Sequence, residues 1–245
     1  MQKIKELLND ILQTLEKNNH RNNKKHYDNY KIINLQQIIQ NKTVALVGPS
    51  NFLHNKKLGK LIDSYDVVIK VNNFHILPSI DYGKKTDILF HNFFGTIPDK
   101  SVMDNNTKLL VGSHPFPKCP NNPNKQSFQI SKKKYNNILH QVFPEELLSV
   151  NIKKLINNDI WKTSGFRVIC LLLDKIDIMK QLNIFGIDFC FNNYNLIYNK
   201  NNTTPSHNIK KELYLFKELF KNYKNNKKVV IHDKYFLKYL NETNN

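Results

Sequence analysis

Arginine is nearly absent from this basic chain. Of its 37 lysines and arginines only Arg21 and Arg167 are arginines, and with 20 acidic residues the formal net charge is +17. Such a charge suggests a polyanionic partner. Arginine, however, is the side chain that makes bidentate contacts with phosphate and guanine, so its scarcity argues against a nucleic-acid partner. Lys, Asn and Ile have A/T-rich codons, and a genome of low GC content explains much of the excess.

Cysteine and long apolar runs are also scarce. The three cysteines, Cys119, Cys170 and Cys190, are too few for a disulfide framework and too scattered for a metal site. The N-terminus has no uninterrupted apolar stretch of the kind found in signal peptides. The longest apolar run, residues 168–173, is far shorter than a membrane-spanning helix. We therefore expect a soluble, cytoplasmic protein without a transmembrane segment.

The composition is nevertheless that of a folded protein. Of the 245 residues, 40% are hydrophobic and 11% aromatic, which is enough for one core and excludes wholesale disorder. Apolar residues at helical spacing predict an amphipathic helix over residues 2–17, followed by a polar linker over 18–30. We expect residues 1–30 to be this appendage and 31–245 to be one domain. The helix would pack on that domain or on a second subunit, which makes a homo-oligomer one of the expected arrangements.

Short apolar segments alternate with helical patterns along the rest of the chain. The predicted strands are residues 43–47, 66–71, 86–90, 108–111, 182–187 and 228–231. The predicted helices are residues 132–158, broken near Pro144, 164–181 and 207–223. Residues 115–129 hold four prolines and predict a surface excursion. This alternation predicts an α/β protein, a Rossmann-like α/β/α sandwich with a mostly parallel sheet.

The first candidate binding segment follows the strand at 43–47. In open α/β sheets the ligand lies outside the carboxyl ends of the strands, where a glycine lets the backbone approach it. Gly48 is placed for that role, and Ser50 and Asn51 follow in the same turn, where Asn51 offers a donor and an acceptor. The segment contains neither a G-x-G-x-x-G nor a Walker A pattern, and an ordinary turn explains it equally well.

Two further segments place polar groups beside predicted elements. Asn72 follows the second strand, where its amide can face the same edge of the sheet or simply form a turn. Ser164 and Gly165 open the apolar helix at 164–181, and free N–H groups at a helix N-terminus suit a phosphate. The simpler interpretation is that Ser164 only caps the helix.

His207 and Glu212 begin the last predicted helix. The helix dipole favours the neutral form of a histidine at an N-terminus, as a general base requires. A surface histidine without a function is the alternative. Glu212 lies about one turn further along, where a supporting role is more plausible than proton transfer.

Taken in order, these segments resemble the motifs of the sialyltransferase family (glycosyltransferase family 29). Residues 44–91 are similar to its large sialylmotif, with a strand, a glycine turn, LGKLIDSYDVVIKVN and then DYGKKTD. Residues 163–189 are similar to its small sialylmotif. His207 and Glu212 match the H-x4-E pattern of its very small motif.

The resemblance implies a variant GT-A type glycosyltransferase fold. It also implies an inverting, metal-independent transfer of a sugar from a CMP-activated donor, such as CMP-sialic acid, to a hydroxyl of a glycan acceptor. No cofactor is implied. His207 would remove the proton from the acceptor hydroxyl, with Glu212 in support. The residues implied to bind the donor are Gly48, Ser50, Asn51, Asn72, Ser164 and Gly165.

The chain departs from the family between its second and third motifs. Where the family has a histidine that assists the leaving phosphate, residues 192–200 have none, and Tyr194, Tyr198 or Lys200 are the candidates for that task. Most of the lysine excess is background, and Lys85 and Lys200 are the two candidates for a lysine that attracts an anionic donor. The family's motif-linking cysteine pair and membrane anchor are also missing. A catalytically degenerate member that binds a nucleotide or glycan is therefore the alternative, followed by a basic nucleic-acid-binding protein.

Overall fold

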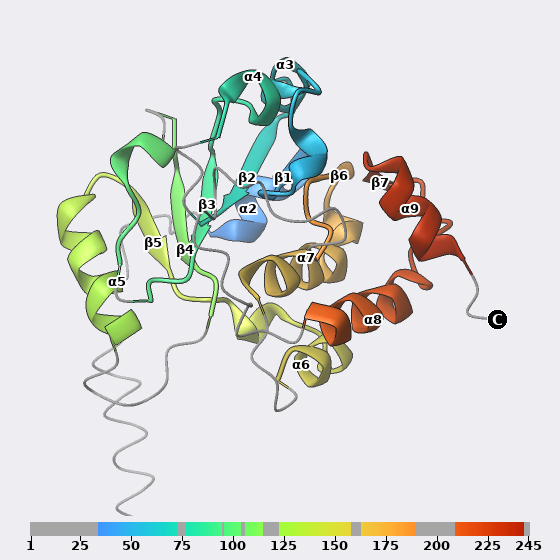
Figure 1. Cartoon of the computed structure of the whole chain (residues 1–245). Coiled ribbons are helices and arrows are strands. Elements are labelled where there is room, and N and C mark those ends of the chain that lie inside the picture. The colour runs from blue at the N-terminus through green and yellow to red at the C-terminus, as the bar shows by residue number, and fades with distance from the viewer. Residues whose placement is uncertain are drawn as a thin grey trace, which may run out of the picture. The chain divides into compact units, whose positions relative to one another are not determined.

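A sheet of seven short parallel strands forms the centre of the computed structural model (Figure 1). The structure describes residues 34–72, 77–94, 96–103, 106–114, 123–157, 163–189 and 209–242. Residues 34–245 make up one compact unit. The predicted N-terminal helix and its linker lie outside the described residues.

The sheet has the strand order β5-β4-β3-β2-β1-β6-β7. Every neighbouring pair is parallel, with Val44 of β1 opposite Val67 of β2 and Leu182 of β6. The strands are β1 (Thr43–Val47), β2 (Val67–Val71), β3 (Ile88–His91), β4 (Leu109–Gly112), β5 (Leu139–Gln141), β6 (Gln181–Phe185) and β7 (Val229–Ile231). The predicted α/β fold with a mostly parallel sheet is thus confirmed.

The strand order reverses at β1. Strands β2 to β5 are added on one side of β1, whereas β6 and β7 are added on the other. In doubly wound sheets of this kind, the crevice outside the carboxyl ends of the two strands at the reversal is the usual ligand site. The fold therefore points to the turns that follow β1 and β6.

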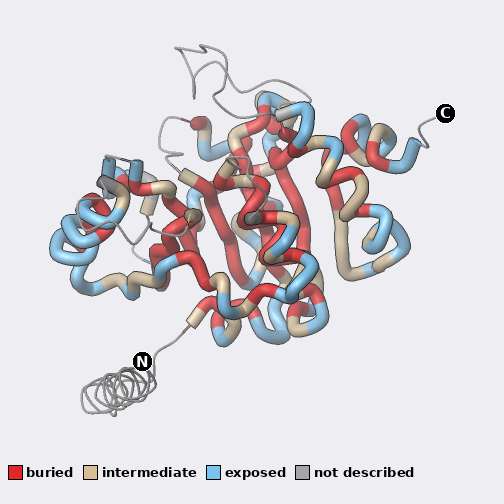
Figure 2. Tube along the Cα trace, turned by 90° about the horizontal axis from the view of Figure 1, so that it is seen from below, coloured by how far each residue is buried: buried red, intermediate tan, exposed pale blue. Residues whose placement is uncertain are grey.

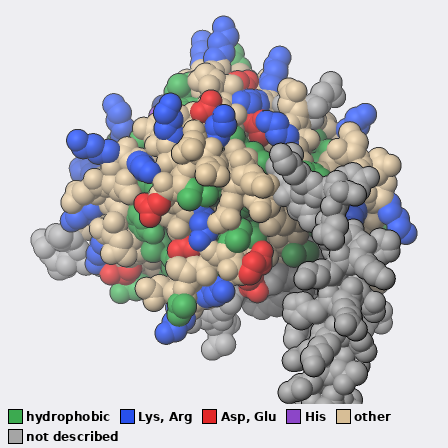
Figure 3. Space-filling model, turned by 180° about the vertical axis from the view of Figure 1, so that it is seen from behind, with side chains coloured by type: hydrophobic (Ala, Val, Ile, Leu, Met, Phe, Trp, Pro, Cys, Tyr) green, Lys and Arg blue, Asp and Glu red, His purple; other side chains and the backbone are tan. Residues whose placement is uncertain are grey.

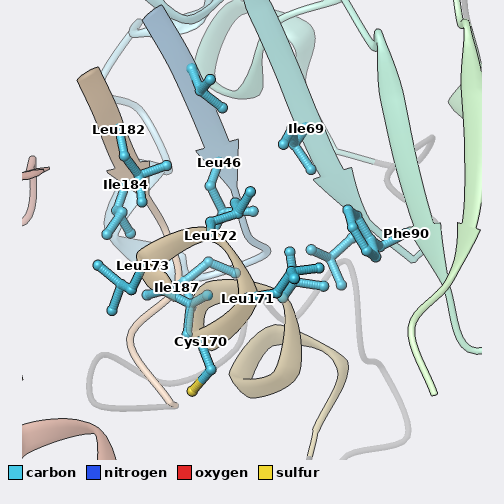
Figure 4. Close-up of a cluster of buried hydrophobic side chains, with 14 of the residues drawn as sticks. Leu46, Ile69, Phe90, Cys170, Leu171, Leu172, Leu173, Leu182, Ile184 and Ile187 are labelled. Carbon is cyan, nitrogen blue, oxygen red and sulfur yellow. The ribbon is translucent and has the colours of Figure 1, made fainter. Parts of the chain in front are cut away.

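Helices cover the sheet and bury alternate strand residues in two separate clusters. One cluster contains Leu46 and Ile69 together with the apolar side of α7; the other contains Ala45 and Val68 with Tyr82 of α4. Figure 4 shows Leu171 and Leu172 of α7 next to the strand residues of the first cluster, and Figure 2 shows buried residues along the strands. The helices are α2 (Leu35–Ile39), α3 (Gly59–Asp63), α4 (Ser79–Tyr82), α5 (Pro123–Lys134), α6 (Val150–Asn157), α7 (Ser164–Asp174), α8 (Ile209–Phe220) and α9 (Lys234–Asn241).

Three of the sequence predictions are wrong in detail. Residues 132–158 do not form a broken helix, because α5 ends at Lys134 and the edge strand β5 lies before α6. The predicted surface excursion over 115–129 is helical from Pro123 onward, since proline is well tolerated in the first turn of a helix. The helix predicted for 164–181 ends at Asp174, because Gln181 already pairs in β6.

The lysines do not gather into one patch on the face shown in Figure 3, where they lie scattered among acidic and apolar side chains. That face lacks the clustered charge that nucleic-acid-binding proteins present. Across the described ranges, no helix is both long enough and apolar enough to span a bilayer.

Candidate functional site at the carboxyl edge of the sheet

The turns after β1 and β6 lie in direct backbone contact. The Gly48 N–H donates to the Phe185 carbonyl over 2.7 Å, and the Ser50 N–H donates to the Gly186 carbonyl over 3.1 Å. A Cβ atom on Gly48 would lie only 2.1 Å from the Gly186 carbonyl oxygen. Gly48 is therefore required by the crossing of the two turns, a packing reason that the sequence alone did not reveal.

Ser50 is held at this crossing from three sides. Its hydroxyl donates to the Asp188 carboxylate over 2.5 Å and accepts from the Phe52 N–H over 3.1 Å. The Tyr82 hydroxyl donates to the Ser50 carbonyl over 2.9 Å. Ser50 and Asp188 are only 1% and 4% exposed, so a buried charge-assisted pair lies at the point where the strand order reverses. The neighbouring Asn51 is exposed at this edge.

Asn72 joins the ends of β2 and β3. Its backbone is in the left-handed region, with φ of 60°, which asparagine tolerates better than most residues. Its N–H donates to the Phe90 carbonyl over 2.7 Å, and its side-chain carbonyl accepts from the Asn92 N–H over 3.2 Å. The side-chain oxygen of Asn72 thus supports the loop after β3.

His91 ends β3 as a buried, neutral histidine. Burial lowers its pKa to about 4. Its Nδ1 accepts a hydrogen bond from the Phe93 N–H over 2.9 Å, which places the ring proton on Nε2. The imidazole therefore organises the turn after β3 in its uncharged form.

The N-terminus of α7 reaches the end of β4. Thr163, not Ser164, is the N-cap, because its hydroxyl accepts from the Phe166 N–H over 3.2 Å. Ser164 is the first residue of the helix, and its hydroxyl lies 2.8 Å from that of Ser113. A Cβ atom on Gly165 would be 3.5 Å from the nearest side-chain atom, so this position has room for a larger residue.

Glu212 of α8 is fully buried and contacts the same turn. Its carboxylate accepts from the Thr163 N–H over 2.6 Å and from the Thr163 hydroxyl over 2.7 Å. Nearby, Arg167 is 8% exposed, and its Nε and Nη1 have no hydrogen-bond partner among the described residues. Burial lowers the pKa of Arg167, while the carboxylates of Glu145 and Glu212 favour its charged form.

Several predicted residues lie elsewhere. Lys85 binds the carbonyl of Asp66 over 3.0 Å, and because Asp66 precedes β2, this lysine is at the amino edge of the sheet rather than at the candidate site. His207, and with it Tyr194, Tyr198 and Lys200, lies outside the described residues.

Some polar residues at the carboxyl edge were not predicted. Asn92, Ser113, His114 and Asp188 each follow a strand by one to three residues. The signal that identified Asn72, a polar residue just after a predicted strand, also applies to them. Together with Ser50, Asn51, Asn72 and Ser164 they give this edge mainly neutral donors and acceptors, which suits hydrogen bonding to a sugar or a phosphate.

Comparison with known proteins finds one family model that matches the first part of the chain. The family model of glycosyltransferase family 29 (sialyltransferase) matches residues 2–115. The matched region contains the segment 44–91, which resembles the large sialylmotif, and ends before the segment 163–189, which resembles the small one. The resemblance to sialyltransferases is confirmed. No curated protein matches the sequence.

Solved structures of sialyltransferases are also similar. A mammalian sialyltransferase in complex with Gal-beta-1-3GalNAc-ortho-nitrophenol is 18% identical with a TM-score of 0.47, covering 80% of this chain and 71% of that one. The monofunctional alpha-2,3-sialyltransferase Cst-I from Campylobacter jejuni is 17% identical with a TM-score of 0.49, covering 83% and 78%. The sialyltransferase CST-II in complex with a trisaccharide acceptor and CMP is 17% identical with a TM-score of 0.46, covering 75% and 78%.

Proposed function

We propose that the chain is an inverting, metal-independent glycosyltransferase of sialyltransferase type with a variant GT-A fold. It transfers a sugar from a CMP-activated donor to a hydroxyl of a glycan acceptor. The observation that supports this proposal most strongly is the spatial grouping of the predicted donor-binding residues. Ser50 and Asn72 belong to the first motif and Ser164 to the second, yet all three lie at the carboxyl edge of one parallel sheet.

The donor would lie against the N-terminus of α7. There the hydroxyl of Ser164 and the first N–H groups of the helix, including that of Gly165, offer hydrogen bonds to an anionic oxygen, and the helix dipole adds to the attraction. Asn51 and Asn72 would hold the cytidine ribose and the phosphate side of the donor. Gly48 and Ser50 form the turn beneath them.

The chemistry proposed for the transfer is a single displacement. His207 takes the proton of the acceptor hydroxyl, that oxygen attacks the anomeric carbon, and CMP leaves with its bonding electron pair, which inverts the anomeric centre. Tyr194, Tyr198 or Lys200 would donate to the leaving phosphate, because charge develops there in the transition state. Glu212 would act indirectly, through the first turn of α7.

Nucleotide binding and transfer test this proposal separately. CMP should raise the melting temperature more than UDP or GDP at equal concentration, and a chelator should leave transfer unchanged. His207→Ala should abolish transfer from CMP-sialic acid while its affinity for CMP stays that of the wild type. Stabilisation by UDP or GDP but not by CMP would contradict the donor assignment.

The absence of a histidine from residues 192–200 favours one second candidate, a degenerate family member that binds a nucleotide or a glycan without turnover. Hydrolysis of CMP-sialic acid or transfer from it above the background rate excludes this candidate. CMP binding without either reaction, over a panel of CMP-sugars and glycan acceptors, supports it.

A further inference from the structure

Two buried serines and a histidine form a hydrogen-bonded chain at the end of β4. The Ser113 hydroxyl lies 2.8 Å from the Ser164 hydroxyl and 3.0 Å from Nδ1 of His114. Ser113 is fully buried and Ser164 is 6% exposed. Ser113 therefore links the imidazole to the residue that we place against the donor.

Hydrogen bonds hold both serines of this chain in place. The Ser113 N–H donates to the His91 carbonyl over 2.9 Å, which extends the β3–β4 pairing to Ser113. Thr163 caps α7 and is itself held by Glu212, so Ser164 is fixed as the first residue of the helix. Buried hydroxyls held in this way keep one set of partners, which makes the direction of each hydrogen bond consequential.

Each hydroxyl has one proton and can accept two hydrogen bonds, so the chain has three possible arrangements. If Ser164 and Nδ1 of His114 both donate to Ser113, the Ser164 proton is used within the protein. If Ser164 donates to Ser113 and Ser113 donates to His114, the Ser164 proton is used in the same way. If Nδ1 of His114 carries a proton and donates to Ser113, and Ser113 donates to Ser164, the proton of Ser164 remains available for a ligand. Of the three arrangements, only this last one lets Ser164 donate to an anionic oxygen.

We propose that Ser113 and His114 are positioning residues that direct the Ser164 hydroxyl toward an anionic oxygen of the CMP-sugar. The inference rests on the proposed function and assigns roles to two residues outside the motifs. In this arrangement His114 acts on the donor through Ser113, and Ser113 acts through Ser164. The effects of the three residues on donor affinity are therefore coupled.

Isothermal titration with CMP and with CMP-sialic acid, on the full chain and its variants, tests this coupling. A hydrogen bond to a charged group contributes enough that Ser164→Ala should raise the Kd of at least one of the two ligands about tenfold or more. Ser113→Ala should raise the same Kd by about 3- to 10-fold although Ser164 is intact. The double variant should bind no more weakly than Ser164→Ala alone, because Ser113 works through Ser164.

His114 offers an independent pair of variants. His114→Ala should raise the Kd about threefold or more, whereas His114→Asn, whose side-chain amide can take the place of Nδ1 and donate to Ser113, should restore most of the affinity. A matched control is Ser131→Ala, which removes another buried serine–histidine contact, 3.2 Å from His140, between α5 and β5. This control should lower the melting temperature and leave both Kd values unchanged.

The outcomes separate the two proposals. If the wild type binds neither CMP nor CMP-sialic acid, the proposed function and this inference both fail. If the wild type binds but Ser113→Ala and His114→Ala bind equally well, the positioning role fails and the proposed function stands. Additive losses in the double variant, or a loss in His114→Asn as large as that in His114→Ala, also overturn the positioning role.

Discussion

Glu212 of α8 holds the first turn of α7 through Thr163. One carboxylate oxygen accepts from the Thr163 N–H over 2.6 Å, and the other accepts from its hydroxyl over 2.7 Å. Thr163 belongs to the segment 163–189 and Glu212 to the H-x4-E pattern, which are separate in the sequence. The contact joins the start of α7 to the first turn of α8. The position of Ser164 therefore depends on a residue 48 positions away in the sequence.

Replacing Glu212 should loosen that turn. Glu212→Ala leaves the half-buried N–H and hydroxyl of Thr163 without their acceptor and opens a cavity, so the free energy of unfolding should fall by about 3 kcal/mol. Glu212→Gln keeps one acceptor and should lose about 1 kcal/mol. Urea denaturation of the purified variants measures both values.

Glu218, on the same helix, is the matched control. It forms an exposed ion pair with Lys221, 2.7 Å apart, and such pairs contribute little to stability. Glu218→Ala should therefore change the free energy of unfolding by less than about 0.5 kcal/mol. If Glu218→Ala and Glu212→Ala lowered the free energy of unfolding equally, the contact between Glu212 and Thr163 would make no specific contribution to stability.

Two glycines at the site should respond to alanine in opposite ways. Gly48→Ala would place its Cβ 2.1 Å from the Gly186 carbonyl oxygen, so the two turns must separate and stability should fall by about 3 kcal/mol or more. Gly165→Ala meets nothing closer than 3.5 Å and lies in a helix, where alanine is favoured by up to about 1 kcal/mol. Thermal denaturation of both variants should show Gly165→Ala at or above the wild-type melting temperature and Gly48→Ala well below it.

The strands could be predicted from the sequence because each is a short apolar run, as strands buried on both faces must be. Six predicted strands are present within two residues of their expected bounds. The strand β5 was missed because it is a partly exposed edge strand without such a run. The contacts of the site could not be predicted, because the Ser50–Asp188 pair joins residues 138 positions apart, and no local pattern specifies which strands become neighbours.

We expect the hydrogen bond between Ser50 and Asp188 to contribute both to the stability of the fold and to nucleotide binding. Asp188→Ala leaves the buried Ser50 hydroxyl without its acceptor, and we expect a loss of about 2 to 3 kcal/mol in the free energy of unfolding. It should also reduce the shift in melting temperature that CMP produces, because the turn at Gly48 is no longer held. Asp99→Ala, which removes an exposed serine–aspartate contact of 2.7 Å with Ser101, is the control and should cost under about 1 kcal/mol with no change in the CMP shift.

His91 should make the protein less stable in acid. Burial lowers its folded-state pKa to about 4, below the ordinary value of 6.5, so between these pH values the unfolded chain binds a proton that the folded chain does not. The free energy of unfolding should therefore fall as the pH drops from 6.5 to 4, by up to about 3 kcal/mol from this residue, with no contribution to the slope well above pH 6.5. His91→Asn keeps an acceptor for the Phe93 N–H but does not titrate. Urea denaturation across this range should give a flatter slope for His91→Asn than for the wild type, and identical slopes would contradict a neutral, buried His91.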